Sequence, residues 1–217
     1  SWSLPVTGFG VAIFDQDHDG VLDGYFANGA VNLPGAPRDA RSPFSERSQF
    51  VRRDANGRFV DHTETVGEAM ATARVSRSVI TGDYDNDGDV DLLVTNNDES
   101  PQLLRNDQNS GHAWLMIELK PGEDGAAVLN SKVQVVAGGR SYVRELRPHC
   151  GYLGTHDARV HFGLGAATVV EKLTVIWPDQ TQETWKLLPV NKHIRLVKGT
   201  SPSVESSQKV HPLRSSE

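Results

Sequence analysis

Two short stretches of the sequence crowd aspartates at the same spacing. The stretch "DQDHDGVLD" begins at Asp15 and "DYDNDGDVD" begins at Asp83, so the pattern D-x-D-x-D-G-x-x-D occurs twice. Alternate residues of a curled loop direct their side chains toward one centre, and like charges held there repel one another unless a cation neutralises them. Carboxylate and carbonyl oxygens are hard ligands that suit Ca²⁺. The spacing therefore predicts one Ca²⁺ in each loop, with plain acidic turns as the alternative.

The loop positions assign a role to each residue. Positions 1, 3, 5 and 9 would supply carboxylates, position 7 its backbone carbonyl, and the Gly at position 6 would allow a sharp bend. The expected metal ligands are Asp15, Asp17, Asp19, Val21 and Asp23 in the first loop, and Asp83, Asp85, Asp87, Asp89 and Asp91 in the second. Because position 7 acts through its carbonyl, we expect the side chain of Asp89 at the surface. The side chain of His18, at position 4, is likewise expected to point outward.

Other metal motifs agree less well with these loops. An EF-hand needs a bidentate Glu at position 12 and flanking helices. Position 12 is Phe26 in one loop and Val94 in the other, and both flanks are strand-like. Zinc sites are built from Cys and His, and neither loop contains Cys. The loops are therefore expected to close around Ca²⁺ from position 9.

The segments around the loops are expected to be strands. Apolar runs precede and follow both loops, and Asn56-Gly57 favours a tight hairpin between two further strands. Residues 65–77 are expected to hold one helical turn. From residue 111 onward the pattern is one of strands, with hairpin turns at Gly138-Gly139 and Pro178-Asp179.

The predicted fold is therefore all-β. Residues 1–108 would form two β-propeller-type blades, a partial propeller carrying the two calcium loops. Residues 109–198 would form a β-sandwich-like domain that folds without calcium. Residues 199–217 are polar and Ser-rich, and we expect a flexible, disordered tail.

Several stretches resemble a known domain pair. "FDQDHDGVLDGYFANG" and "GDYDNDGDVDLLVTNN" resemble the FG-GAP/VCBS repeats of integrin-α-like propellers. "VQVVAGGRSYVREL", "GYLGTHDARVHFGLG" and "KLTVIWPDQTQETWKL" resemble the ASPIC/UnbV domain. The combination is similar to the cartilage acidic protein family. This resemblance implies one Ca²⁺ per loop, bound by the aspartates at positions 1, 3, 5 and 9, and a loop that joins the first two strands of a blade.

The resemblance also implies a function. Such proteins are typically secreted, so an extracellular or periplasmic location is expected, with a binding or adhesion-type role and no catalytic residues. The unnamed partner would be a protein or a glycan. The alternative is an accessory or enzymatic protein of a bacterial biosynthetic pathway. One departure is that a propeller normally closes with at least about four blades, whereas this sequence shows two repeats.

Composition narrows the classes of partner. The chain has 28 acidic and 22 basic residues and a net charge of -6, with no basic stripe of the kind that nucleic-acid binding needs. No apolar run approaches the roughly 18 residues of a membrane span. We therefore expect neither a nucleic-acid partner nor a membrane span.

A few other residues are of types that can carry chemistry. The single cysteine, Cys150, is expected to be a small buried hydrophobe. It lies within a histidine cluster made of His149, His156 and His161, whose spacing matches no zinc pattern, so hydrogen-bonding or surface roles are expected. Asp157 is expected to be a turn acid. Three arginines are expected on a solvated strand face, namely Arg140, Arg144 and Arg147.

Overall fold

The computed structural model describes residues 6–31, 43–54, 56–149 and 151–205, so Cys150 lies outside the described residues. The fold is all-β, as predicted. Within the described ranges, helical structure is limited to two 3-10 turns, η1 (Thr63–Thr65) and η2 (Glu68–Met70). They lie in and just before the segment in which one helical turn was expected.

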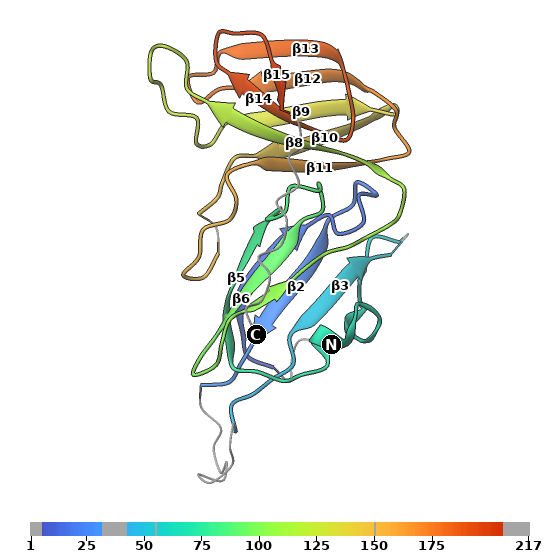
Figure 1. Cartoon of the computed structure of the whole chain (residues 1–217), viewed down its shortest axis with the longest axis vertical. Helices are drawn as coiled ribbons and strands as arrows, with labels where there is room; N and C mark the ends of the chain where they lie inside the picture. The colour runs from blue at the N-terminus through green and yellow to red at the C-terminus, as the bar shows by residue number, and fades with distance from the viewer. Residues whose placement is uncertain (1–5, 32–42, 55, 150, 206–217) are drawn as a thin grey trace, which may run out of the picture.

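The first half of the chain forms two antiparallel sheets (Figure 1). One sheet has the order β1-β2-β3-β4, formed by β1 (Gly8–Phe14), β2 (Asp23–Asn28), β3 (Gln49–Arg53) and β4 (Phe59–Asp61). The other has the order β5-β6-β7, formed by β5 (Ser76–Gly82), β6 (Asp91–Asn96) and β7 (Gln102–Leu104). Each sheet is a simple meander, so the repeat seen in the aspartates extends to the strands around them.

These two sheets pack face to face around one core. Phe14, Tyr25 and Phe50 from the first sheet meet Val79 and Val94 from the second, and all five are nearly inaccessible to solvent. A Cβ atom built on Gly10 would lie only 2.7 Å from the backbone nitrogen of Val79. Glycine at this position therefore allows the backbones of β1 and β5 to approach closely. We call the two sheets the blade sheets after the two blades that the sequence predicts. The described residues contain no closed ring of sheets, so the propeller arrangement stays a prediction.

The second half is a sandwich of two four-stranded sheets. One has the order β10-β9-β12-β13, formed by β10 (Arg140–Glu145), β9 (Lys132–Ala137), β12 (Val170–Ile176) and β13 (Gln182–Leu188). The other has the order β11-β8-β14-β15, formed by β11 (Val160–Gly165), β8 (Ala113–Lys120), β14 (Lys192–Val197) and β15 (Ser203–Glu205). Alternate residues of both sheets fill a shared core that includes Leu115, Val135, Phe162, Leu173 and Leu196.

The expected turns are present, and the expected tail is partly ordered. Gly138 and Gly139 both have positive φ, at 57° and 72°, and connect β9 to β10 as predicted. By contrast, β15 lies inside the segment expected to be flexible. It pairs antiparallel with β14 through Ile194 and Val204. The open edge of β14 supplies unpaired backbone groups, so a short extended segment can pair there. Residues 206–217 lie outside the described part.

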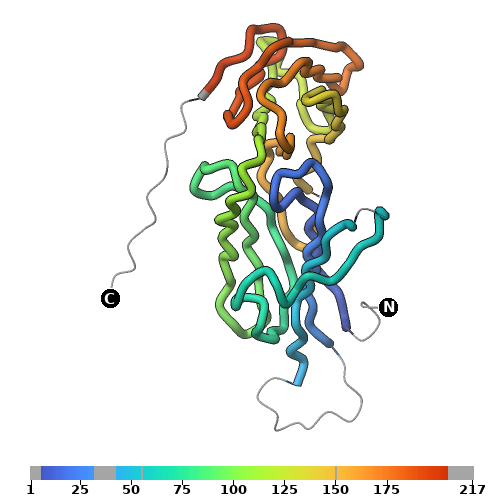
Figure 2. The backbone as a smooth tube through the Cα atoms, turned by 90° about the vertical axis from the view of Figure 1, so that its right-hand side faces the viewer, coloured from blue at the N-terminus to red at the C-terminus, as the bar shows by residue number. Residues whose placement is uncertain are grey.

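The sandwich sits on one end of the blade sheets. In Figures 1 and 2 the two halves stack along the long axis of the molecule, and the loops that follow β1 and β5 face the sandwich. The connection between β10 and β11 runs back along β5 (Figure 1). In that connection Tyr152 meets Phe9 edge-on at a centroid distance of 5.3 Å. The loops that carry the aspartates are therefore at the junction between the two halves.

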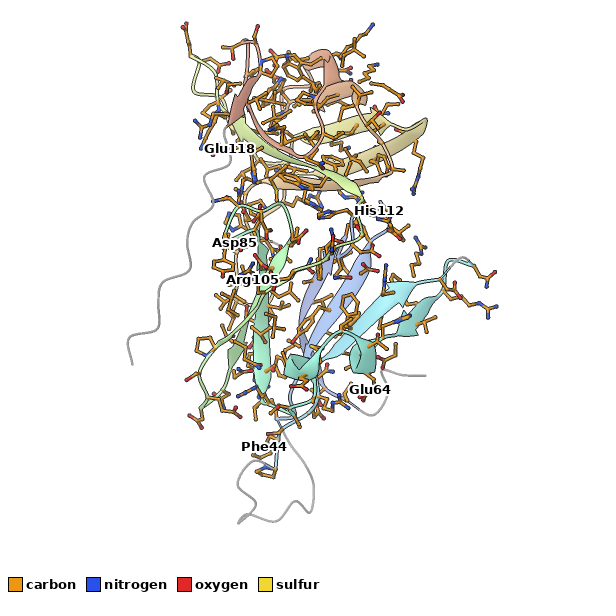
Figure 3. All side chains as sticks on the ribbon, turned by 45° about the vertical axis from the view of Figure 1, so that its right-hand side comes forward. Phe44, Glu64, Asp85, Arg105, His112 and Glu118 are labelled. Carbon is orange, nitrogen blue, oxygen red and sulfur yellow. The ribbon has the colours of Figure 1, made fainter. Side chains whose placement is uncertain are left out.

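The side-chain view shows the same arrangement. Asp85 and Arg105 lie close to the junction, whereas Phe44 and Glu64 lie toward the far end of the blade sheets (Figure 3). The acidic loops are therefore concentrated at the end that meets the sandwich. No helix in the described ranges is long and apolar enough to cross a membrane.

Candidate metal centres at the domain junction

The two aspartate loops have the same backbone conformation. Position 4 is left-handed in both, with φ of 60° at His18 and 59° at Asn86. Position 6 is a glycine with positive φ in both, 85° at Gly20 and 100° at Gly88. Glycine adopts this conformation without the steric cost that a Cβ would impose. The sequence repeat is therefore a structural repeat, and it predicts equal placement of the carboxylates.

Hydrogen bonds fix the carboxylates in equivalent ways. The position-1 carboxylate accepts from the glycine N–H, at 2.9 Å for Asp15 and 3.0 Å for Asp83. The position-9 carboxylate accepts from the N–H of position 2, at 3.1 Å for both Asp23 and Asp91. The position-5 carboxylate accepts from the N–H of position 7 in both loops, at 2.7 and 3.0 Å. In the first loop Oδ1 of Asp15 stays free of hydrogen bonds, whereas in the second loop both oxygens of Asp83 and of Asp91 accept from backbone N–H groups, and the buried oxygen without a partner belongs to Asp85.

Three carboxylates converge in each loop. Oxygens of Asp15, Asp17 and Asp19 lie within 4.8 Å of one another, as do oxygens of Asp83, Asp85 and Asp91. Asp23 and Asp87 are outside these groups, although both belong to the predicted ligand sets. These groups concern side-chain oxygens, so ligation by the backbone carbonyls of Val21 and Asp89 stays a prediction.

The free oxygens of the clusters fit a hard cation. The Oδ1 atoms of Asp15, Asp17 and Asp85 are buried and have no hydrogen-bond partner. A buried charged oxygen without a partner is costly, and coordination of a cation removes that cost. An all-oxygen donor set suits Ca²⁺ better than Zn²⁺. When bound, Ca²⁺ would neutralise the converging carboxylates of each loop.

Burial and mutual repulsion make these carboxylates poor acids when no cation is near. Burial, followed by the charge of Asp19, raises the pKa of Asp15 to about 7. Burial also raises the pKa of Asp23, Asp83 and Asp91 to about 6 each. A bound cation would offset both effects, because it stabilises the charged form of a buried carboxylate and reduces the repulsion among neighbouring acids.

An arginine approaches each acidic loop from the third strand of its own sheet or the residue just after it, since Arg52 lies on β3 and Arg105 directly follows β7. In the first loop Arg52 contacts the carboxylate of Asp17, and its Nε lies 3.6 Å from Oδ1 of Asp23. In the second loop Nη2 of Arg105 lies 3.4 Å from Oδ2 of Asp85. The two arginines partly balance the acids at the rim of each loop, while the Oδ1 atoms of Asp17 and Asp85 stay without a partner.

The sandwich and the segment leading to it cover the first loop. Arg140 donates to the carbonyl of Asp19 at 3.0 Å, and the Gly165 N–H donates to the carbonyl of His18 at 2.8 Å. A Cβ on Gly163 would lie 2.0 Å from Oδ2 of Asp15. This close approach requires glycine at position 163, because any side chain would push the sandwich off the loop.

The second loop is held by different residues. Arg159 donates to the carbonyl of Asp83 and to the side-chain oxygen of Asn86, each at 2.7 Å. Trp114 packs against Gly88, where a Cβ would lie 2.0 Å from the indole ring. Both loops therefore contact the sandwich. The residues that would hold a metal ion lie in the same loops that join the two halves of the chain.

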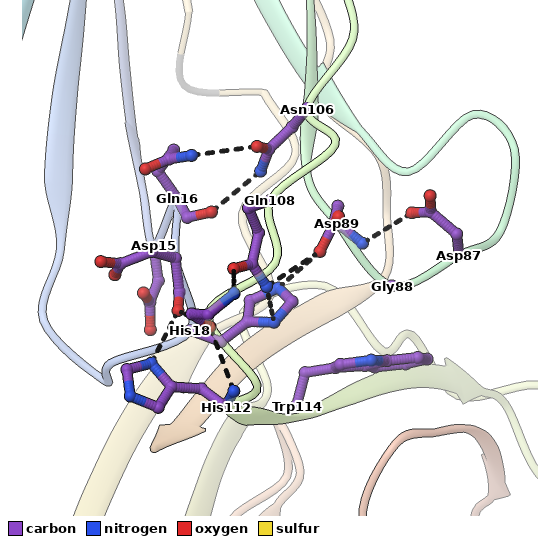
Figure 4. A network of polar contacts seen from close by, with 12 residues as sticks. Asp15, Gln16, His18, Asp87, Gly88, Asp89, Asn106, Gln108, His112 and Trp114 are labelled. Carbon is purple, nitrogen blue, oxygen red and sulfur yellow. Dashed lines mark hydrogen bonds and ion pairs between the residues drawn. The ribbon is translucent and has the colours of Figure 1, made fainter. Parts of the chain in front are cut away.

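Two sequence expectations about the loops are wrong. His18 was expected to point outward, but it is 1% exposed, because the second loop and the sandwich close over it. Asp89 was expected at the surface, but it is 8% exposed. Nε2 of Gln108 contacts both side chains, at 3.0 Å from Nδ1 of His18 and 3.3 Å from Oδ1 of Asp89 (Figure 4). Position in a loop predicts the direction of a side chain, but not what the rest of the chain places there.

The segment between β7 and β8 connects the two loops. The Asn106 N–H donates to Oδ1 of Asp91 at 2.8 Å. The Asn106 side chain makes two hydrogen bonds with Gln16, at 2.9 and 3.0 Å (Figure 4). Sequence reasoning missed these residues, because amide side chains outside the acidic repeat carry no spacing signal.

The histidine cluster near Cys150 does not assemble. The ring of His149 faces Thr155, Nδ1 of His156 accepts from the Thr81 N–H at 3.0 Å, and His161 stacks near His18 with centroids 5.0 Å apart. In the described part of the chain, the only groups of three or more His, Cys, Asp or Glu close enough to share an ion are the two aspartate clusters. Asp157 accepts from Arg159 and so anchors the turn, as expected of a turn acid.

Comparison with known proteins gives a consistent description. Residues 76–116 match the FG-GAP repeat, and residues 122–203 match the ASPIC and UnbV family. The chain is also similar to cartilage acidic protein 1 of Homo sapiens, with 27% identity over 184 residues. That alignment covers 82% of this chain but only 26% of the relative, so the chain spans about a quarter of the relative's length. This chain thus carries an FG-GAP repeat, which includes the second acidic loop, followed by an ASPIC/UnbV domain.

Proposed function

We propose that this chain is a calcium-stabilised, extracellular adhesion-type module without catalytic activity of its own. The observation that carries the proposal is the repeated loop framework. In both loops backbone N–H groups hold carboxylate oxygens and three carboxylates converge, and the buried Oδ1 atoms of Asp15, Asp17 and Asp85 have no hydrogen-bond partner. The FG-GAP repeat and the similarity to cartilage acidic protein 1 support a binding role for a protein or glycan partner.

Calcium concentration supports an extracellular or periplasmic location. Loops of this type are expected to bind Ca²⁺ with a Kd on the order of 10⁻⁴–10⁻³ M, as extracellular modules do. For a Kd of about 10⁻⁴ M and roughly millimolar calcium, each site stabilises the fold by ~1.4 kcal/mol. At about micromolar calcium the same site contributes almost nothing. The acidic loops are therefore useful where calcium is plentiful.

Calorimetry tests the assignment of the two sites. Calcium titrated into the whole chain should show two sites. Asp17→Ala should remove the first and Asp85→Ala the second, because each deletes a carboxylate whose buried Oδ1 has no hydrogen-bond partner. Glu123→Ala is the matched control, since Glu123 is an exposed acid outside both loops. A double variant with unchanged stoichiometry would exclude these ligand sets.

An accessory or enzymatic role is the second candidate, favoured by a cleft at the junction. The cleft is lined by His156, Asp157 and Arg159, among others. In the described structure, His156 and Asp157 do not form an acid–base pair. Nδ1 of His156 accepts from Thr81, while both oxygens of Asp157 are held within the turn by Arg159 and its N–H. The cleft is therefore better suited to binding than to acid–base chemistry.

A further inference from the structure

The cleft at the junction has apolar walls and a volume of about 450 Å³. Val11 and Ile13 on β1 contribute side chains that are 39% and 51% exposed, and Met116 on β8 lies behind them. The connection between β10 and β11 closes another side. Small-molecule sites are typically concave, mostly apolar and of about 300–1,000 Å³, with a few polar groups that fix orientation. The size and walls of this cleft match that description.

Three arginines line the cleft, and two of them already have carboxylate partners. Arg159 contacts Asp157, and Arg147 lies 3.0 Å from Glu145. Arg144 differs from them. Its Nη1 donates only to the neighbouring Val143 carbonyl, and its Nη2 is buried with no hydrogen-bond partner. Its sequence position had indicated a solvated face, and that expectation is wrong, because β10 turns this side chain toward the junction.

The surroundings of Arg144 leave its charge poorly compensated. Its guanidinium lies over the ring of Phe162, with 5.6 Å between Cζ and the centroid. Burial lowers the pKa of Arg144, and the charge of Asp15 opposes that effect only in part. Nε2 of His161, in the same cleft, is also buried without a partner. A buried guanidinium nitrogen left in this state is costly unless an anion or water reaches it.

We propose that this cleft binds a small organic carboxylate, whose anionic group accepts from Arg144 and whose apolar body lies along Val11, Ile13 and Met116. A singly charged group suits the site better than phosphate, because Asp15 and Asp83 also line the cleft and repel a second negative charge. The apolar walls favour a ligand with a hydrocarbon body over a bare anion. The proposal concerns a ligand that neither the FG-GAP repeat nor the calcium centres require.

The two methionines of the chain provide a built-in test. Met116 lines the cleft and pairs with His161 across β8 and β11, whereas Met70 lies in the blade-sheet core away from it. In whole protein labelled with ¹³C at the methionine methyls, octanoate should shift the Met116 signal saturably and leave Met70 unchanged. Octanamide, which has a similar body without the charge, and inorganic phosphate should bind at least tenfold more weakly. Octanoate is titrated both in millimolar calcium and in chelator, so that a response of Met116 to octanoate is distinguished from a response to calcium.

Two variants complete the test. Arg144→Leu removes the donor beside Phe162 without adding a methionine, and should weaken octanoate binding about tenfold or more. Arg53→Leu is the matched control, since Arg53 is exposed on β3 and outside the cleft, and should leave the affinity unchanged. Retained Met116 and Met70 signals verify that each variant is folded. The proposal is overturned if Met116 does not respond to octanoate in either buffer, or if octanamide or the Arg144→Leu variant binds as tightly.

Discussion

At the scale of single residues, the two candidate metal centres share a framework but differ in their surroundings. Their backbone angles agree, and the hydrogen bonds accepted by the carboxylates at positions 1, 5 and 9 recur, although Asp19 joins the first cluster and Asp91 the second. The rims differ, because Arg52 contacts one loop closely while Arg105 is shared between Asp85 and Asp107. A cation already present at the rim reduces repulsion among the acids but also repels an incoming Ca²⁺. We therefore expect the first site to be the weaker of the two.

Removal of the positive charge of Arg52 should strengthen calcium binding at the first loop but lower the stability of the calcium-free protein. Arg52→Ala should raise the calcium affinity of the first site roughly three- to tenfold, because a positive charge beside the ion is lost. In chelator the same variant should be less stable by about 1 kcal/mol, a modest amount because the pair is partly exposed. Calorimetry and urea unfolding measure the two effects. Arg53→Ala, one residue along β3, should change neither, and unchanged affinity in Arg52→Ala would mean that Arg52 leaves the loop when calcium binds.

The carboxylates were predictable from the sequence, and most of their partners were not. The regular spacing of the aspartates is a local signal, and local backbone conformation fixes where those side chains point. The bridge through Gln108 joins residues 90 positions apart, and the burial of His18 depends on the second loop and the sandwich, which are also distant in the sequence. No spacing rule covers such contacts. Arg144 is a similar case. Its alternation with apolar neighbours indicated a strand correctly, but it did not indicate which part of the chain packs against the Arg144 side chain.

At the scale of elements, the hairpins and most strands followed from turn residues and apolar alternation. Gly138-Gly139 and Asn56-Gly57 give hairpins for a local reason, since glycine accepts positive φ. Non-local pairing was not predictable. β14 runs parallel to β8, and β15 adds to its other side. Strand order across a sandwich depends on which edges remain open after the hairpins form, and the sequence pattern does not encode that directly.

The contact between β8 and the second loop provides a test at this scale. Gly88→Ala places a Cβ against Trp114 at a position whose φ is 100°, so both a clash and backbone strain are introduced. We expect a loss of about 3 kcal/mol or more in the free energy of unfolding. Gly111→Ala is the control for strain alone, since φ there is 71° and no atom lies within 4 Å of the new Cβ. It should cost about 1–2 kcal/mol.

A double variant separates packing from strain. If the clash dominates, adding Trp114→Ala to Gly88→Ala should recover part of the lost stability, and the two effects will not be additive. Strict additivity in chemical unfolding would mean that the indole and the loop do not meet in solution.

At the scale of the whole molecule, two cores meet through the acidic loops. The sandwich core is built from residues of β8 to β14 and the connections among them, and the blade sheets have a core of their own. Neither core contains the aspartates, which lie between the two. We therefore expect the sandwich to fold without calcium, and its attachment to the blade sheets to weaken when no cation neutralises the acidic loops between them.

Calcium removal should therefore loosen the junction before either core. In hydrogen exchange, transfer from millimolar calcium to EDTA should reduce protection of amides that donate to or within the loops, such as those of Gly20, Gly88, Asn106 and Gly165. Two sites of ~1.4 kcal/mol each predict a loss approaching a hundredfold if both stabilise the same closed state. Central amides of β9 and β12 should exchange equally slowly in both buffers. Equal exchange of the loop amides with and without calcium would show that the centres are not structural. Added exchange throughout β9 and β12 would show instead that the sandwich depends on the metal for its own fold, contrary to the separation of the two cores.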